Sequence, residues 1–190
     1  MTFANKITIA RILLIPLFVL FAVYYGRSVE QGQPEEWQRW AAVAVFLVAS
    51  VTDSLDGWVA RRFGQRSPLG AVLDPIADKG LLLTAIITLS LSKWTYAFPL
   101  WFPVLVIARD AVIVMGCVLL KHLNGDLEVR PSLWGKMATA LQMVAIAWVM
   151  LQLPFHLYSV YVAGFFTLVS GIGYLLDGVT RLRHHDSPDA

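Results

Sequence analysis

Residues 51–79 read VTDSLDGWVARRFGQRSPLGAVLDPIADK, and this stretch decides the fold class. Its aspartates come in two pairs: Asp53 and Asp56 lie three positions apart, and Asp74 and Asp78 lie four apart. Residues three or four apart share one face of an α-helix, so each pair projects from one side of a helix. Two such helices facing each other bring four carboxylates around one point. Hard cations such as Mg²⁺, Mn²⁺ and Ca²⁺ prefer oxygen ligands, so the pattern predicts a divalent-metal site.

Small and basic residues accompany the two aspartate pairs. Gly57 and Ala60 share a helix face with the first pair and leave that face nearly bare beside the carboxylates. Gly70 stands one helical turn before the second pair and also clears space there. Arg61 and Arg62 follow with positive charge, which suits a phosphate group. The stretch therefore predicts a flat, phosphate-bearing ligand beside the metal.

The composition indicates an integral membrane protein. The chain has 190 residues, of which 57% are hydrophobic and 15% charged, against about 25% charged in soluble domains. The mean hydropathy is +0.64. A net charge of +2 is too small to indicate a nucleic-acid partner. The single cysteine, Cys117, excludes a disulfide framework and a CxxC metal site.

Six apolar segments are long enough to span a bilayer, which takes about 20 residues. We expect an all-α membrane protein, a bundle of six transmembrane helices in a single domain over residues 1–190. The first segment lacks a small-residue cleavage site and is expected to be retained. Lys and Arg concentrate in alternate loops, which predicts that both termini and the aspartate site face the cytoplasm, in a bacterial inner membrane. The predicted spans are about 7–26, 39–61, 73–92, 99–121, 134–153 and 156–177.

Several polar residues lie inside these spans. Arg11 is either a positive-inside anchor or a group that reaches the aspartate site. Arg109 and Asp110 are adjacent, so they point about 100° apart, and we expect each to have its own partner. At its depth Arg109 should face the interior, toward an aspartate of the motif or an anionic substrate. Asp110 is expected to orient a neighbour, either Arg109 or a polar group on another span. Gln142 is expected to form a hydrogen bond between helices.

The spacing Asp53-x2-Asp56-Gly57-x2-Ala60-Arg61-x8-Gly70-x3-Asp74-x3-Asp78 resembles the signature of the CDP-alcohol phosphatidyltransferases. The resemblance extends from Asn5 to roughly Gln142. It implies transfer of a phosphatidyl group from CDP-diacylglycerol to an alcohol, with release of CMP. It also implies a homodimer among membrane lipids, and two divalent ions, Mg²⁺ or Mn²⁺.

The same resemblance implies a role for each residue of the motif. The last aspartate, Asp78, is the catalytic base. All four aspartates are metal ligands, Asp78 included. The residues that hold the CDP-lipid are Asp56, Gly57, Ala60, Arg61 and Gly70.

The acceptor alcohol is predicted from the fourth and fifth spans, where Arg109 and Lys136 are positioned to bind its phosphate. Enzymes of this family that make phosphatidylglycerophosphate usually carry an Arg-Glu pair on the fourth span, with another arginine two turns later. This chain has Arg109-Asp110 instead, and the later position falls near Cys117. The stretches IARD (107–110) and QRSPLGAVLDPIADK (65–79) look more like the cardiolipin synthases of this family. We therefore expect phosphatidylglycerol as acceptor, which would make cardiolipin. The alternative acceptor is glycerol 3-phosphate.

Two other classes of protein also use clustered carboxylates in membranes. Prenyltransferases place Asp-rich motifs on facing helices, but they need about nine spans and lack the Gly57-x2-Ala60-Arg61 element. A cation channel or transporter needs a polar path across the bilayer. The outer halves of these spans are almost entirely apolar, so the site is expected to be a pocket with one mouth.

Overall fold

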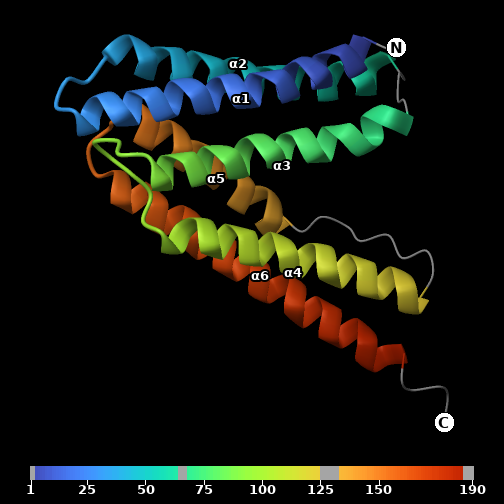
Figure 1. The fold of residues 1–190 in the computed structure, drawn as a ribbon. Coiled ribbons are helices and arrows are strands. Elements are labelled where there is room, and N and C mark those ends of the chain that lie inside the picture. The colour runs from blue at the N-terminus through green and yellow to red at the C-terminus, as the bar shows by residue number, and fades with distance from the viewer. Residues whose placement is uncertain (1–2, 64–67, 125–132, 186–190) are drawn as a thin grey trace. The chain divides into compact units, whose positions relative to one another are not determined.

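The computed structural model describes helix bounds for residues 3–63, 68–124 and 133–185, and side chains for residues 8–52, 77–116, 118 and 133–176. Within these ranges the chain forms six α-helices and no β-strand, which confirms the predicted all-α fold. Each predicted apolar segment overlaps one helix. The helices are α1 (Phe3–Glu30), α2 (Glu36–Phe63), α3 (Pro68–Leu91), α4 (Trp101–Asn124), α5 (Leu133–Met150) and α6 (His156–His185) (Figure 1).

Three stretches of helix are long and apolar enough to cross a membrane, within the part of the chain that the structure describes. They are Thr8–Glu30, Leu133–Met150 and His156–Leu176, with hydropathies of 2.1, 1.3 and 1.7. Large apolar side chains are exposed on these helices, among them Leu13 and Tyr158. Exposed apolar surface of this kind is suited to lipid, and it indicates a membrane protein. Six spans and cytoplasmic termini stay predictions.

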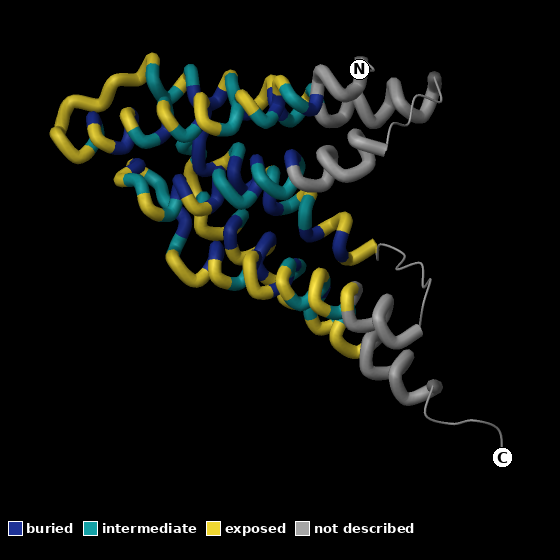
Figure 2. Tube along the Cα trace, turned by 45° about the vertical axis from the view of Figure 1, so that its right-hand side comes forward, coloured by how far each residue is buried: buried dark blue, intermediate teal, exposed yellow. Residues whose placement is uncertain are grey.

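The chain divides into two compact units. Unit 1 consists of Met1–Pro99 with Ile146–Leu153, and unit 2 consists of Leu100–Ala145 with Pro154–Ala190. Helix α5 therefore contributes to both. Along the helices of each unit, buried positions alternate with exposed ones (Figure 2). The prediction of a single domain stays a prediction.

In unit 1, α1 packs against α2 and α3 (Figure 1). Phe18 on α1 and Phe46 on α2 are buried with their ring centroids 5.9 Å apart. Small residues bring α1 and α3 together, because a methyl group on Gly80 would lie only 3.4 Å from the end of Ile15. This contact places the first turns of α1 beside the part of α3 that carries the last motif aspartate.

In unit 2, α4 and α6 lie side by side. Trp101 at the start of α4 stacks on Tyr161 of α6, with centroids 5.6 Å apart and planes 19° from parallel. Gly164 makes room for this ring, since a methyl group there would lie 2.8 Å from Trp101. On the other side of α6, Phe166 meets Trp134 of α5 at 6.1 Å.

Helix α1 ends in a Schellman motif, in which a residue of left-handed conformation lets the last carbonyls find donors. Gly32 has φ 74°, and its N–H donates to Val29 C=O at 3.0 Å. The N–H of Gln33 donates to Ser28 C=O at 3.0 Å. Glycine suits the left-handed position because it has no Cβ.

Helix α5 ends in the same motif without a glycine. Gln152 has φ 53°, and the N–H of Leu153 donates to Trp148 C=O at 3.1 Å. A left-handed conformation costs a non-glycine residue about 1–2 kcal/mol. The side chain of Gln152 offsets this cost with hydrogen bonds, because its Nε2 donates to the hydroxyls of Tyr25 at 2.7 Å and Thr95 at 3.3 Å. These contacts hold the end of α5 in place within unit 1.

Candidate active site

The aspartate motif lies on α2 and α3, as its spacing predicts. One of its residues, Asp78, falls within the described side chains. The other predicted roles stay predictions, because those residues lie outside the described side chains: Asp53, Asp56, Gly57, Ala60, Arg61, Gly70 and Asp74.

Arg11 and Asp78 form an ion pair between α1 and α3. The Nη1 of Arg11 donates to Oδ1 of Asp78. The Arg11 side chain is fully buried, whereas the Asp78 carboxylate side chain is 44% exposed. Of the two interpretations of Arg11, contact with the aspartate site is therefore the one that the structure shows.

Burial explains why this pair matters to the site. A guanidinium inside an apolar bundle needs a charged or polar partner, because burying an unpaired charge is costly. Thr8, one turn before Arg11 on α1, is also buried, at 1% exposure. The N-terminal part of α1 thus carries two buried polar residues, and one of them, Arg11, holds Asp78 of α3.

The chemistry of the four aspartates fits a hard divalent cation. Carboxylate oxygens are the ligands that Mg²⁺ and Mn²⁺ take, and magnesium sites commonly combine one or two carboxylates with substrate phosphates. Asp78 is exposed enough to contribute an oxygen to such a site. Arg11 is fully buried and places a positive charge beside this carboxylate.

Unit 2 contains a second buried arginine, Arg109 on α4, which is 7% exposed. Its Nη1 donates to Asp110 Oδ1 at 2.7 Å, and its Nη2 donates to Ser170 Oγ of α6 at 2.9 Å. The guanidinium also lies 5.9 Å from the centre of the Tyr174 ring. Gly171 gives the side chain room, because a methyl group there would lie 3.4 Å from Arg109 Cγ. The predicted interior position of Arg109 is confirmed.

Arg109 has a partner of its own in Ser170, as expected, but the expectation that Arg109 and Asp110 would point away from each other is wrong. Adjacent Cβ atoms do diverge on a helix, but the arginine side chain is long enough to turn back and reach Asp110 Oδ1 at 2.7 Å. Its Nε is buried and has no hydrogen-bond partner among the described residues. Arg109 therefore keeps one donor for a further group. The predicted role of Asp110 in orienting a neighbour fits this pair.

Gln142 forms the predicted hydrogen bond between helices. Its Nε2 donates to Thr167 Oγ1 of α6 at 2.8 Å. Thr167 uses its one hydroxyl hydrogen on the carbonyl of Ala163 at 2.7 Å, which fixes the orientation of the Gln142 amide. Lys136 lies exposed in the first turns of α5. The binding of an acceptor by Arg109 and Lys136 stays a prediction.

The residues of α6 that meet these groups were not predicted. Thr167, Ser170 and Tyr174 recur at helical spacing on one face of α6, within its apolar stretch from 162 to 176. A polar stripe of this kind is the signal by which the sequence indicates them, since intramembrane polar groups usually face the interior of a bundle.

Comparisons with known proteins agree with one another. A family profile described as CDP-alcohol phosphatidyltransferase matches residues 1–172. A protein of Mycobacterium tuberculosis named "Probable phosphatidylglycerophosphate synthase" is 35% identical over 178 residues, which cover 90% of this chain and 79% of the relative. Proteins named "CDP-diacylglycerol--glycerol-3-phosphate 3-phosphatidyltransferase" match from Shigella flexneri and Escherichia coli. The Shigella protein is 36% identical over 89% of this chain and 90% of its own length. The Escherichia coli protein is 38% identical over 76% of this chain and 74% of its own length.

Proposed function

The chain belongs to the CDP-alcohol phosphatidyltransferase family, and from this premise we propose that it transfers a phosphatidyl group from CDP-diacylglycerol to glycerol 3-phosphate. The product is phosphatidylglycerophosphate, and CMP is released. The observation that carries the proposal is the similarity to relatives named for this acceptor, at 36% identity over 89% of this chain. Family membership favours this enzyme over a channel, a transporter or a prenyltransferase.

The comparisons favour glycerol 3-phosphate over the expected phosphatidylglycerol. That expectation rested on Asp110 in place of a glutamate and on the absence of an arginine near Cys117. In the structure Asp110 accepts a hydrogen bond from Arg109 at 2.7 Å. Aspartate and glutamate both carry a carboxylate that can accept a hydrogen bond from an arginine in this way. The aspartate therefore does not argue for a different acceptor.

The reaction is a displacement at phosphorus. The hydroxyl oxygen of glycerol 3-phosphate attacks the β-phosphorus of CDP-diacylglycerol, a new P–O bond forms, and the bond to CMP breaks. The hydroxyl proton passes to a carboxylate, which we assign to Asp78. Divalent ions, when bound by Asp53, Asp56, Asp74 and Asp78, supply positive charge to the diphosphate.

Arg11 has a positioning role in this proposal. Its ion pair holds Oδ1 of the Asp78 carboxylate, and in this proposal that contact orients the carboxylate for the attacking hydroxyl. Preorganised groups of this kind lose less entropy when substrates bind. Gly57, Ala60, Arg61 and Gly70 hold the cytidine nucleotide in the same proposal.

The acceptor phosphate is assigned to Arg109 and Lys136. Arg109 has a buried Nε–H without a partner among the described residues, which is suited to an oxygen of the acceptor. Lys136 is exposed and has a flexible side chain that can follow a mobile anion. We further propose a homodimer in a bacterial inner membrane, with the site on the cytoplasmic side, as the distribution of Lys and Arg favours.

The test is product identification by mass spectrometry. Purified protein is supplied with CDP-diacylglycerol, Mg²⁺ and both acceptors at equal concentration. We expect phosphatidylglycerophosphate and CMP in equal amounts. Cardiolipin as the main product would overturn the acceptor and leave the family intact.

A further inference from the structure

A cleft of about 370 Å³ lies in unit 1 between the end of α1 and the end of α3. Its size falls in the usual range of ligand pockets, about 300–1,000 Å³. Val23, Ile87 and Leu91 form an apolar wall. Arg27, Glu30 and Lys93 form a charged mouth.

The cleft is separate from the aspartate site. Arg11 contacts the aspartate site and Arg27 lines the cleft, and both lie on α1. Arg11 is toward the start of this helix and Arg27 is in its last turn. At 1.5 Å per residue they are about 24 Å apart along the helix. None of the cleft residues has a role in the proposed transfer.

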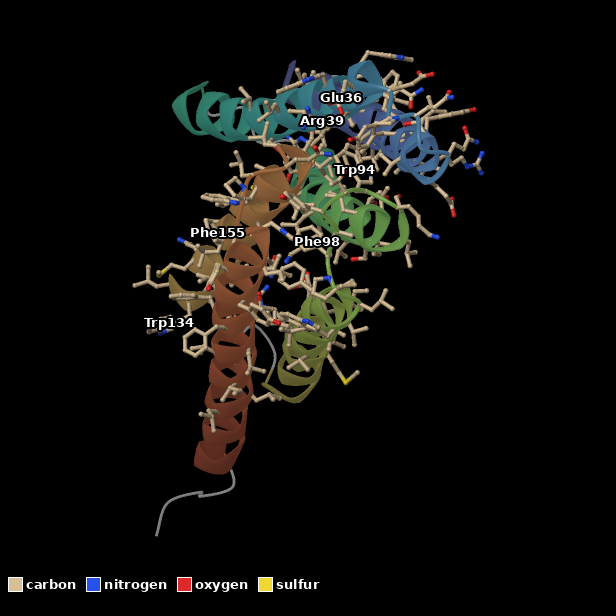
Figure 3. The ribbon with its side chains drawn as sticks, turned by 90° about the vertical axis from the view of Figure 1, so that its left-hand side faces the viewer. Glu36, Arg39, Trp94, Phe98, Trp134 and Phe155 are labelled. Carbon is tan, nitrogen blue, oxygen red and sulfur yellow. The ribbon has the colours of Figure 1, made fainter. Side chains whose placement is uncertain are left out.

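The mouth of the cleft lies at the end of a membrane span. The apolar stretch of α1 runs from Thr8 to Glu30, so Arg27 and Glu30 occupy its last turn. Tryptophan marks the same end: Trp94 follows α3 and donates its Nε1–H to Ala22 C=O at 2.9 Å. Figure 3 views unit 1 from this end and labels Trp94 there, near Glu36 and Arg39 of α2. Tryptophans and basic residues gather where helices leave the bilayer, which places the mouth at the membrane–water interface.

The floor of the cleft is closely packed. A methyl group on Gly26 would lie 2.9 Å from Ser92 Cβ and 3.1 Å from the backbone nitrogen of Lys93. The Ser92 hydroxyl already donates to Thr88 C=O at 2.6 Å. Since that hydroxyl proton is used on the backbone of α3, the charged groups that line the cleft are the side chains at its mouth.

The net charge at the mouth of the cleft suits a ligand with one negative charge. Lys93 Nζ lies 3.0 Å from Glu30 Oε1, and these side chains are 70% and 55% exposed. Arg27 is also exposed. Two cations and one anion leave a formal charge of +1, which complements a single phosphodiester.

Cations near a helix C-terminus also stabilise the helix itself. That effect accounts for Arg27, which is in the last turn of α1. It does not account for Glu30 in the same turn, nor for an apolar wall that continues from the charges along the helices. An apolar wall below an interfacial cation is the layout of a lipid site, with the acyl chain against the wall.

We propose that this cleft binds a phospholipid whose headgroup carries one phosphodiester charge. The phosphate lies between Arg27 and Lys93, and one acyl chain runs along Val23, Ile87 and Leu91. The ligand class is an anionic membrane lipid with a single charge, at the end of unit 1 away from the aspartate site.

Native mass spectrometry of the full chain in detergent tests this site, with phosphatidylglycerol as the probe and phosphatidylcholine and inorganic phosphate as comparisons. Replacing both cations, Arg27→Gln with Lys93→Gln, should weaken phosphatidylglycerol binding about fivefold for each cation removed, as expected for basic residues at a membrane surface. The matched control is Arg39→Gln, because Arg39 is a cation of α2 that pairs with Glu36 and does not line the cleft. It should leave binding unchanged. Turnover of CDP-diacylglycerol in the same preparations reports folding.

A third variant should change the affinity for phosphatidylglycerol in the opposite direction. Glu30→Gln removes the anion from the mouth and releases Lys93, so phosphatidylglycerol should bind about fivefold more tightly. Weaker binding in Glu30→Gln, or equal loss in Arg39→Gln and the double variant, would overturn the proposal. Displacement of the lipid by inorganic phosphate at the same concentration would also overturn it, because the ligand would then be a phosphate ion. Equal binding of phosphatidylcholine would contradict the charge argument.

Discussion

Arg11 on α1 pairs with Asp78 on α3 across 67 positions of sequence, with the guanidinium fully buried and the carboxylate partly exposed. The two side chains of this ion pair are therefore in different environments. Arg11 is confined by the bundle, whereas the Asp78 side chain is 44% exposed. A residue in the bundle interior thus acts on the proposed chemistry through an aspartate of the motif.

The first prediction concerns Arg11. Arg11→Ala should lower kcat about 10- to 100-fold, the usual loss when a group that orients a functional ligand is removed. Arg11→Lys keeps the charge but loses the planar fork, so it should recover only part of the activity. Steady-state kinetics in mixed micelles measure both, and thermal unfolding checks the fold. Full activity in Arg11→Ala would show that the ion pair is only structural.

The second prediction concerns the metal. EDTA should abolish turnover and Mg²⁺ or Mn²⁺ should restore it. Asp53→Asn or Asp56→Asn should lower turnover more than about 100-fold at saturating metal, because charge stabilisation by bound ions is worth several kcal/mol. Binding of Mn²⁺, followed by electron paramagnetic resonance, should fall in the same variants. Wild-type turnover in EDTA would contradict the metal assignment.

The third prediction separates the base from the ligands. Asp78→Asn should lower turnover about 10²- to 10⁴-fold, the range for loss of a general base. It should still bind CDP-diacylglycerol in the presence of metal. Asp74→Asn should weaken that binding instead. Equal loss of binding in both variants would make Asp78 chiefly a ligand.

The fourth prediction concerns the acceptor. Arg109→Ala or Lys136→Ala should raise the KM for glycerol 3-phosphate about tenfold or more, as expected for loss of a hydrogen bond to a charged group. The KM for CDP-diacylglycerol should stay unchanged. Ser170→Ala is the matched control for Arg109, because it removes one structural contact of the guanidinium and leaves the charge. A higher KM for both substrates in Lys136→Ala would mean that the two pockets are not separate.

The fifth prediction concerns the packing of unit 1. Gly26→Ala places a methyl group 3.1 Å from the backbone nitrogen of Lys93, and backbone cannot give way cheaply. Overpacking should lower the free energy of unfolding by about 1–3 kcal/mol. Gly116→Ala is the control, since nothing lies within 4 Å of the added methyl group, and it should gain up to about 1 kcal/mol in helix propensity. Thermal unfolding in detergent should move in opposite directions for the two variants.

Much of the helical architecture follows from the apolar pattern, while the helix ends do not. Helix α1 continues to Glu30, beyond the predicted end near residue 26, because its polar last turn stays helical until Gly32 turns left-handed. Helix α5 stops at Met150, before the predicted residue 153, because Gln152 closes it. Both ends depend on local backbone conformation, which apolar periodicity does not report.

In the candidate site, too, the sequence pattern predicts one part and packing determines the rest. The spacing of the aspartates places them on α2 and α3, but it does not show that Arg11 reaches Asp78, because that contact depends on how α1 packs. The spacing left open whether Asp110 would meet Arg109 or a group on another span, because helical spacing describes where side chains start, not how far a long one reaches. The cleft joins residues 23–30 to residues 87–93, and no local pattern connects two segments so distant in sequence.

The hydrogen bonds of Gln152 have a consequence for biosynthesis. Unit 1 includes Ile146–Leu153, which the ribosome makes after the whole of α4. The contact between Trp94 and Ala22 can form as soon as α3 has left the ribosome, whereas Tyr25 and Thr95 must wait for Gln152. Helices α1, α2 and α3 are therefore synthesised before their unit can be complete. The last piece of that unit arrives only after α4 and most of α5 have been synthesised.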